Sequence, residues 1–319
     1  DTQTSRGLGD VYKRQVGCRI VRSWSRLEVC VMTTARSLSE FLAGQPIGVV
    51  GLGLIGGSLG LDLRQRGHRV VGVAHRQSTV ERALQRGLVD DASSDLDCLK
   101  GCGLVLLALP LDQLIAPELA LIEALPPEAL VLDMGSVKQP VLTAWQPRVS
   151  RFVACHPMAG TAEAGVEAGV SGLFTGRPWV ITPSGQEIPA DLEMARALGR
   201  ELGCVVLECD PADHDRAVAF ISHMPVLVSA ALVQSAAAAE PQGLLQALAS
   251  SGFADTTRIG GGNPALGSLM ARCNREAVQQ ALMAYSSALR ELAERVEQQD
   301  WAALHEALAS AQAARPNFL

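Results

Sequence analysis

The 319-residue chain has few aromatic residues, few lysines and no excess of basic charge. Only 4% of its residues are aromatic while 48% are hydrophobic, so its core must be built from aliphatic side chains. The formal net charge is -6, and the chain lacks the basic stripe that is typical of nucleic-acid-binding proteins. A nucleic-acid partner is therefore not expected.

Paired cysteines and long apolar runs are missing as well. None of the eight cysteines forms a CxxC pair, so neither a zinc site nor a redox motif is indicated, and no metal is expected. Such cysteines are typical of reduced thiols in a cytoplasmic protein. The apolar run from Val226 to Ala239 is too short to span a bilayer, so we expect a buried helix there and no membrane partner.

The first 31 residues are rich in arginine, lack periodicity and contain no apolar segment typical of a secretory signal. The segment TSRGLGDVYKRQ resembles translated sequencing-adapter sequence, and Met32 is the expected natural start. We expect residues 1–45 to be a non-native or disordered leader.

Short apolar segments alternate with helical patterns over residues 46–210, which is typical of a parallel sheet covered on both faces. Strands are expected at 47–50, 69–74, 104–109, 130–133, 152–155, 179–182 and 204–208, and helices at 58–66 and 79–85. Residues 211–319 predict helices at 213–239, 242–250, 263–296 and 301–313, with Asp213 and Asn263 as N-caps. The expected fold is α/β, a Rossmann-type dinucleotide-binding domain (46–210) followed by an all-helical domain (211–319).

A glycine pattern, G-x-G-x-x-G, lies in the stretch IGVVGLGLIGG and consists of Gly51, Gly53 and Gly56. The first glycine permits a tight turn, the second lets the backbone approach a pyrophosphate, and the third lets the helix pack closely on the strand. Leu54 and Ile55, within the turn, are also expected to bind the cofactor, and the free amides at the start of the helix are expected to face its phosphates. Because the pattern follows an apolar strand and opens a helix, it predicts a nicotinamide dinucleotide site.

The end of the second expected strand favours NADP over NAD. An NAD site normally places Asp or Glu there to bind the ribose hydroxyls, whereas this chain reads AHRQST over residues 74–79. Arg76 can bind a 2′-phosphate through two hydrogen bonds, although a solvated turn with a helix cap is the alternative. The residues expected at the adenosine phosphate and adenine are His75, Arg76, Ser78 and Thr79. At the end of the third expected strand, Leu109 and Pro110 are expected to lie beside the cofactor.

Five further motifs follow in order, namely DMGSVK (133–138), HPMAG (156–160), DHD (213–215), SHMP (222–225) and TRIGGG (257–262). With the glycine turn and the helical second half, they resemble the prephenate/arogenate dehydrogenase family of tyrosine biosynthesis, most closely its cyanobacterial arogenate-using type. The resemblance covers nearly all of the chain from residue 47 onward. It implies oxidation of a ring carbinol to a ketone while a ring carboxylate leaves as carbon dioxide.

His156 follows a strand end, where open α/β sheets place ligands, and a neutral imidazole suits proton transfer near pH 7. The resemblance implies that His156 accepts the proton of the substrate hydroxyl; a structural histidine is the alternative. Ser136 follows another strand end and is expected to bond the same oxygen or to orient His156, unless it caps a helix. Lys138 is expected to contact the cofactor or a carboxylate; a position at the surface is the alternative.

Arg258 lies in a glycine-rich loop and is the expected bidentate partner of a substrate carboxylate, unless it caps helix carbonyls. His214 and His223 are nine positions apart, which is about 900° on a regular helix. They should therefore not share a face unless Met224 and Pro225 distort the helix, and one is expected to bind substrate while the other packs internally. The HPMAGT segment also places Gly160 and Thr161 among the expected substrate-binding residues.

Val226 stands where prephenate-using members often carry a second histidine after S-H-x-P, which favours arogenate; prephenate is the alternative substrate. The β-hydroxyacid dehydrogenases share this architecture but rely on a lysine in the helical domain, and no lysine follows Lys138. A nucleotide-binding regulator without turnover is a further alternative. The apolar helices of the second domain predict a homodimer formed through them.

Overall fold

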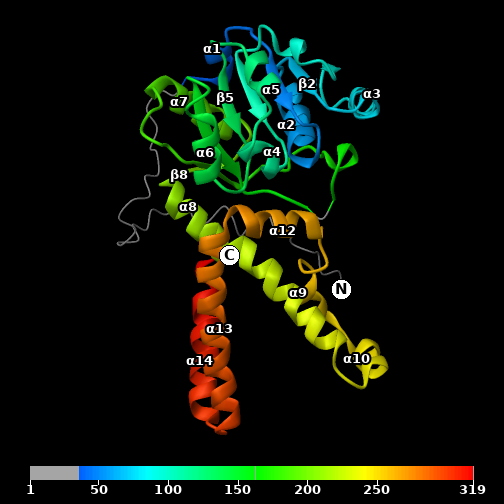
Figure 1. Ribbon diagram of the computed structural model, residues 1–319, viewed down its shortest axis with the longest axis vertical. Helices are drawn as coiled ribbons and strands as arrows, with labels where there is room; N and C mark the ends of the chain where they lie inside the picture. Colours follow the sequence, from blue (N-terminus) through cyan, green and yellow to red (C-terminus); the bar gives the residue numbers. More distant parts are fainter. Residues whose placement is uncertain (1–35, 162, 319) are drawn as a thin grey trace, which may run out of the picture.

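The computed structural model describes residues 36–161 and 163–318, with an α/β domain above two helical arms (Figure 1). The predictions for residues 1–35, including Met32 as the start, lie outside the described residues. Residues 36–45 are part of the fold, contrary to their placement in the leader. Helix α1 (Leu38–Leu42) begins with a capping box between Ser37 and Glu40, and Leu38 and Leu42 are buried.

Eight strands of the described residues form one sheet in the order β3-β2-β1-β4-β5-β6-β7-β8. They are β1 (Ile47–Val50), β2 (Val70–Val73), β3 (Asp91–Ser93), β4 (Leu104–Leu107), β5 (Leu130–Asp133), β6 (Phe152–Pro157), β7 (Pro178–Ile181) and β8 (Val205–Glu208). Every residue of β1, β2, β4, β5 and β6 is buried, as in a sheet covered on both faces. The predicted Rossmann-type class is confirmed.

The sheet differs from the prediction in two places. β3 was not expected, because the three residues Asp-Ala-Ser carry no apolar pattern. The sheet is also not wholly parallel, since β6 runs antiparallel to β7, with His156 opposite Val180. A buried strand has the same apolar composition in either direction, so its sequence does not reveal this reversal.

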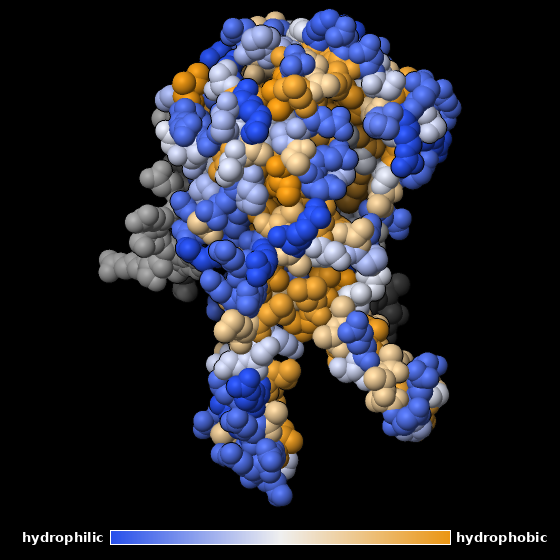
Figure 2. Space-filling model, in the orientation of Figure 1, coloured by the Kyte–Doolittle hydropathy of each residue, from blue (hydrophilic) through white to orange (hydrophobic). Residues whose placement is uncertain are grey.

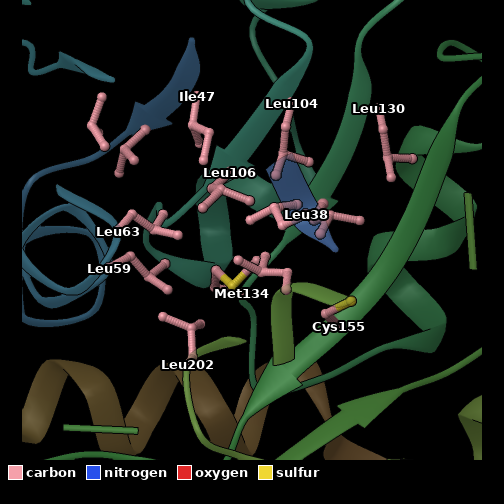
Figure 3. Packing of buried hydrophobic residues seen from close by; sticks show 14 of the residues in the cluster. Leu38, Ile47, Leu59, Leu63, Leu104, Leu106, Leu130, Met134, Cys155 and Leu202 are labelled. Atoms are coloured by element: carbon pink, nitrogen blue, oxygen red, sulfur yellow. The ribbon is translucent and has the colours of Figure 1, made fainter. Parts of the chain in front are cut away.

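Helices cover both faces of the sheet and enclose an aliphatic core. They are α2 (Leu54–Gln65), α3 (Gln77–Gln85), α4 (Leu111–Ile115), α5 (Leu119–Ala124), α6 (Gln139–Trp145) and α7 (Pro189–Glu201). Figure 3 shows Leu59 and Leu63 of α2 packed against Ile47 of β1 and Leu106 of β4. The expectation of a core built from aliphatic side chains is confirmed.

The helical domain continues directly from β8. It consists of α8 (Pro211–Val218), a π-helical turn (Ala219–His223), α9 (Met224–Ala237), α10 (Gln242–Leu248), α11 (Ser251–Thr257), α12 (Pro264–Cys273), α13 (Arg275–Glu297) and α14 (Trp301–Ala314). Asn263 caps α12 as predicted, but α8 is capped by Asp210, whose carboxylate accepts from the Ala212 amide at 2.8 Å, and not by Asp213. The expected helix at 263–296 is interrupted at Asn274, which leaves the helical conformation (φ -121°, ψ 38°).

The helix around Val226–Ala239 is not buried in the single chain, contrary to expectation. Within α9 only Ser229 is buried. Because the π turn joins α8 to α9 without a break, Pro211–Ala237 is one continuous helical stretch that is long and apolar enough to cross a membrane by length and composition alone. Figure 2 shows apolar side chains gathered at the fork between the two arms, so one copy leaves apolar surface uncovered.

Candidate functional site

The glycine turn has the geometry of a phosphate cradle. Gly51 has φ +93°, and a Cβ on it would lie 2.4 Å from the Ala108 carbonyl oxygen. A Cβ on Gly56 would lie 1.8 Å from the Gly51 oxygen, whereas a Cβ on Gly53 would meet nothing within 4 Å. The turn is therefore closed toward the protein and open at the start of α2, where the first amides have no partner within the helix. These residues fit a bound pyrophosphate.

A cavity of about 270 Å³ continues from the glycine turn along the ends of β1, β2 and β4. Its lining includes Gly51, Ala74, His75, Leu109, Gln113 and Glu118. Arg76 stands at the N-cap position of α3 but its side chain makes no capping bond, so the helix-cap alternative does not apply to it. His75, Arg76, Ser78 and Pro110 are exposed at this rim, and Thr79 is half-buried. Their cofactor-binding roles stay predictions.

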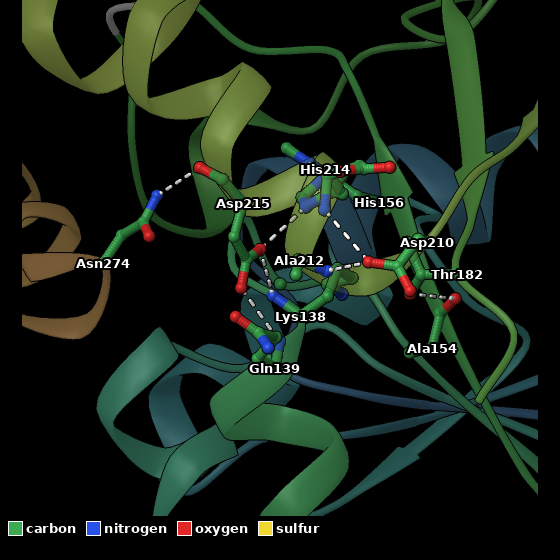
Figure 4. A network of polar contacts seen from close by, with 12 residues as sticks. Lys138, Gln139, Ala154, His156, Thr182, Asp210, Ala212, His214, Asp215 and Asn274 are labelled. Atoms are coloured by element: carbon green, nitrogen blue, oxygen red, sulfur yellow. Dashed lines mark hydrogen bonds and ion pairs between the residues drawn. The ribbon is translucent and has the colours of Figure 1, made fainter. Parts of the chain in front are cut away.

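His156 and the glycine turn lie at the same edge of the sheet. β1, β4, β5 and β6 are mutually parallel, so their carboxyl ends meet at that edge. His156 is the fifth residue of β6, and its side chain meets His214 of α8 (Figure 4). Nδ1 of His156 lies 2.9 Å from Nε2 of His214, and the rings meet edge to face with centroids 5.1 Å apart. The topology thus brings a histidine pair to the edge where α/β proteins bind their ligands.

Asp215 joins the histidine pair to the loop after β5. Its carboxylate accepts hydrogen bonds from the amides of Lys138 (2.7 Å) and Gln139 (2.9 Å), and it lies 2.8 Å from Nδ1 of His214. The Asn274 amide donates to the Asp215 carbonyl oxygen at 2.7 Å. One carboxylate therefore ties α8 to the first domain and holds His214 at the same time.

Lys138 contacts a carboxylate, one of the positions that the sequence left open for it, and does not lie at the surface. Its side chain is fully buried and donates to the Asp133 carboxylate and to the Cys155 carbonyl oxygen, each at 2.5 Å. Asp133 also accepts from the amides of Gly135 (2.8 Å) and Cys155 (3.2 Å). This buried ion pair fixes the loop after β5 against β6, directly behind His156, and leaves Lys138 without a free face for cofactor or solvent.

The π turn explains how two histidines half a turn out of phase can both be buried. It lies between His214 and His223 and widens the helix over five residues, so the second histidine is rotated from its regular position. The predicted distortion is present, but it begins before Met224 and Pro225. Nδ1 of His223 lies 3.3 Å from the Asn274 amide nitrogen, and Nε2 of His223 has no partner among the described residues.

Burial favours the neutral form of the three histidines. It lowers the pKa of His156 well below the ordinary value, and the nearby His214, Lys138 and His223 lower it further. Burial also lowers the pKa of His214, and that of His223 to about 4, although Asp215 opposes both shifts. A neutral imidazole at His156 can accept a proton throughout the physiological pH range.

The remaining predicted residues surround this cluster less closely. Ser136 is half-buried in the loop between Asp133 and Lys138; it is not a helix cap, because α6 begins after Lys138. Gly160 and Thr161 are exposed just beyond β6. Arg258 is exposed at the end of α11, and its guanidinium makes no hydrogen bond with the described residues. Their substrate-binding roles stay predictions.

Three members of the network were not identified as such from the sequence, namely Asp133, Asp215 and Asn274. Asp133 ends an otherwise apolar buried strand, and Asp215 follows His214 directly. Both positions carried a recognisable signal, because a buried carboxylate needs a cation or hydrogen-bond donors beside it. Asn274 lies inside a helical pattern and carried no such signal.

Comparisons with known proteins agree with this geometry. Residues 59–208 match the family model of the prephenate dehydrogenase nucleotide-binding domain, and residues 210–310 match that of the prephenate dehydrogenase dimerization domain. The chain is 34% identical over 226 residues to the prephenate dehydrogenase of Bacillus subtilis, and the match covers 68% of this chain and 61% of that protein.

Two solved structures share the fold over most of the chain. The prephenate dehydrogenase of A. aeolicus, in complex with hydroxyphenyl propionate and NAD+, is 27% identical, with a TM-score of 0.80, over 86% of this chain and 98% of that one. Synechocystis arogenate dehydrogenase is 42% identical, with a TM-score of 0.73, over 86% of this chain and 100% of that one. With both halves of the chain matched to one family and this relative covered along its full length, the chain belongs to the prephenate/arogenate dehydrogenase family.

Proposed function

We propose that this protein is an arogenate dehydrogenase, which converts arogenate to tyrosine with release of carbon dioxide and reduction of NADP. The observation that carries the proposal is the placement of a nine-tenths buried histidine, His156, at the sheet edge that also holds the phosphate cradle. A hydride acceptor and a proton acceptor are the two groups that oxidation of a carbinol requires.

The reaction balances with His156 as the base. A bound NADP⁺ supplies the acceptor for the hydride that leaves the ring carbinol carbon. His156 takes the hydroxyl proton as the carbon–oxygen double bond forms. The bond to the ring carboxylate then breaks, its electrons restore the aromatic ring, and carbon dioxide leaves. His156 returns its proton to the ring oxygen, so the base is regenerated. Ser136 is the proposed second hydrogen-bond partner of that oxygen, and Arg258 the proposed partner of a substrate carboxylate.

The proposed preference for NADP rests on the end of β2. The chain has Ala74 and His75 where an NAD site carries its ribose-binding acid, and the exposed Arg76 follows at the start of α3. A 2′-phosphate bound by Arg76 gains a charge-assisted hydrogen bond that NAD cannot make, worth about 1.5–3 kcal/mol. Arg76→Ala should therefore raise KM for NADP roughly 10- to 100-fold and leave KM for NAD unchanged. An equal change for both cofactors would contradict this assignment.

Arogenate is the proposed substrate because Val226 follows the SHMP segment, so the cation that often faces the ketoacid side chain of prephenate is missing. The 42% identical neighbour, Synechocystis arogenate dehydrogenase, supports the same substrate. Prephenate dehydrogenase is the second candidate, because the Bacillus and A. aeolicus relatives carry that name. Steady-state rates for both substrates with both cofactors decide between them. The arogenate–NADP pair should have the highest kcat/KM of the four, and a higher value for prephenate would overturn the substrate assignment.

We also propose a homodimer formed through the helical arms, as the dimerization-domain match supports. Large apolar side chains are exposed along both arms; they include Leu232, Leu248, Met283, Leu289, Trp301 and Leu308. Leu248→Glu should shift sedimentation toward the monomer. The matched control is Leu119→Glu on α5, since Leu119 is 67% exposed and Leu248 71%. A wild-type protein that sediments as a monomer at micromolar concentration would refute the dimer.

A cytoplasmic location is proposed from the cysteines. The six that the structure describes are free thiols, and burial raises the pKa of Cys102 to about 11 and of Cys204 to about 12. Free thiols of low reactivity are typical of a reducing compartment. Localisation of a tagged chain tests this proposal.

A further inference from the structure

We propose that His214 and Asp215 act as positioning residues that fix the tautomer of His156, so that its Nε2 lone pair is presented to the substrate hydroxyl. The inference deepens the proposed function, on which it rests. It follows from the chain of contacts from Asp215 through His214 to His156 (Figure 4).

The direction of the first hydrogen bond is set by Asp215. Its two oxygens already accept hydrogen bonds from the amides of Lys138 and Gln139, which can only donate. An ionised carboxylate has no proton to give, so the 2.8 Å contact between its Oδ1 and Nδ1 of His214 requires a proton on that nitrogen. His214 is therefore the Nδ1–H form.

The remaining hydrogen bonds then have one consistent assignment. A neutral His214 with its proton on Nδ1 carries a lone pair on Nε2, which can only accept. The 2.9 Å contact from that atom to Nδ1 of His156 therefore requires His156 to donate. A neutral His156 that donates through Nδ1 has its lone pair on Nε2, which has no hydrogen-bond partner among the described residues. That atom is left to take the substrate proton.

The charged surroundings favour this assignment. Lys138 from the loop after β5 and His223 from the π turn lie close enough to lower the pKa of His156, while Asp133 is paired with Lys138. Asp215 on α8 is the anion that faces His214 directly. When His156 is protonated on Nε2, the added charge strengthens its bond to His214, which Asp215 holds in turn. The pair thus orients the base.

Nitrogen-15 NMR of histidine-labelled full-length protein, with and without NADP, tests the tautomers directly. The expected result is a protonated Nδ1 and a bare Nε2 for both His156 and His214 at neutral pH, with signals assigned from His156→Asn and His214→Gln. Asp215→Asn should give His214 a mixture of tautomers. A wild-type His156 with its proton on Nε2 would overturn the proposal.

Kinetics provide the second readout. His214→Leu removes the acceptor and should lower kcat with arogenate by about 10²-fold with little change in KM, at the lower end of what general base catalysis contributes. His214→Gln keeps an acceptor oxygen near the position of Nε2 and should recover part of that loss. His68→Leu is the matched control, because His68 is a largely buried histidine bonded to Glu201 at 2.5 Å, outside this network; its kcat should be unchanged. Equal losses for the Leu and Gln variants of His214 would contradict the positioning role.

The two proposals fail separately. If the tautomers are as expected but neither arogenate nor prephenate is oxidised, the proposed function is wrong, while the assignment of the tautomers by His214 and Asp215 is kept. If substrate is oxidised while His156 carries its proton on Nε2, the positioning role of His214 and Asp215 is wrong, while the proposed function is kept.

Discussion

Replacing Lys138 by methionine tests the buried ion pair on which the loop after β5 depends. Lys138 and Asp133 are both fully buried, and Lys138 donates to Asp133 and to the Cys155 carbonyl oxygen. In Lys138→Met the fully buried Asp133 carboxylate keeps two amide donors but loses its cation. Removing one partner of a buried pair costs about 3–5 kcal/mol, because the other charge is left uncompensated.

The assay is urea unfolding at one fixed protein concentration, since association changes apparent stability. Lys100→Met is the matched control: Lys100 and Asp97 form an ion pair of 2.7 Å at the surface, where their side chains are 73% and 65% exposed. This control should not measurably change the free energy of unfolding. The double variant Lys138→Met with Asp133→Asn should recover much of the loss, because it removes the unpaired charge.

The destabilisation should depend on pH in a definite direction. Burial raises the pKa of Asp133, and without Lys138 nothing of opposite charge opposes that shift. A carboxyl whose pKa is raised in the folded state stabilises the fold below its unfolded pKa, and this stability is lost as pH rises through the folded pKa. Lys138→Met should therefore lose less stability at pH 5 than at pH 8. A loss below about 1 kcal/mol at pH 8, or the same loss at both pH values, would refute the reasoning.

Three further predictions concern the site. Gly53→Val should leave the thermal midpoint unchanged but raise KM for NADP more than tenfold, because its side chain enters open space that the pyrophosphate would fill; a change in the midpoint alone would contradict the cradle. Gly56→Ala should lower both cofactor binding and the thermal midpoint, because its Cβ would lie 1.8 Å from the Gly51 oxygen. In a pH series, kcat/KM should stay constant as pH falls through 6.5 and decline only below it, since burial lowers the pKa of His156; a decline centred at or above 6.5 would contradict the neutral buried base.

Much of the first domain could be predicted because its signals are local. The strands at 47–50 and 130–133 begin and end as expected, and the glycine pattern lies at the predicted turn, since apolar runs and glycine sterics act within a few residues. The strand His156 belongs to was expected to end at Cys155, but it extends to Pro157 because it pairs with β7 on its far side. That pairing joins distant segments, and no local pattern encodes it.

The helical half was predicted less well, for a related reason. Its helices were expected from their composition, but α9 was expected to be buried and only Ser229 of it is, since helical periodicity does not show which molecule covers an apolar face. The break at Asn274 places its side chain against the Asp215 carbonyl oxygen of α8, and the π turn over Ala219–His223 packs against α13, so both depend on contacts between distant segments. These two irregularities complete the network behind His156, whose role was inferred from a motif and not from that geometry.

Replacing His156 by asparagine tests the central claim most directly. Asparagine preserves a polar group of similar size at the end of β6 but cannot take a proton. With arogenate and NADP at saturating concentrations, kcat should fall by about 10²–10⁴-fold while NADP binding and the thermal midpoint stay close to those of the wild type. Unchanged reduction of NADP by the variant would contradict the assignment of His156 as the base.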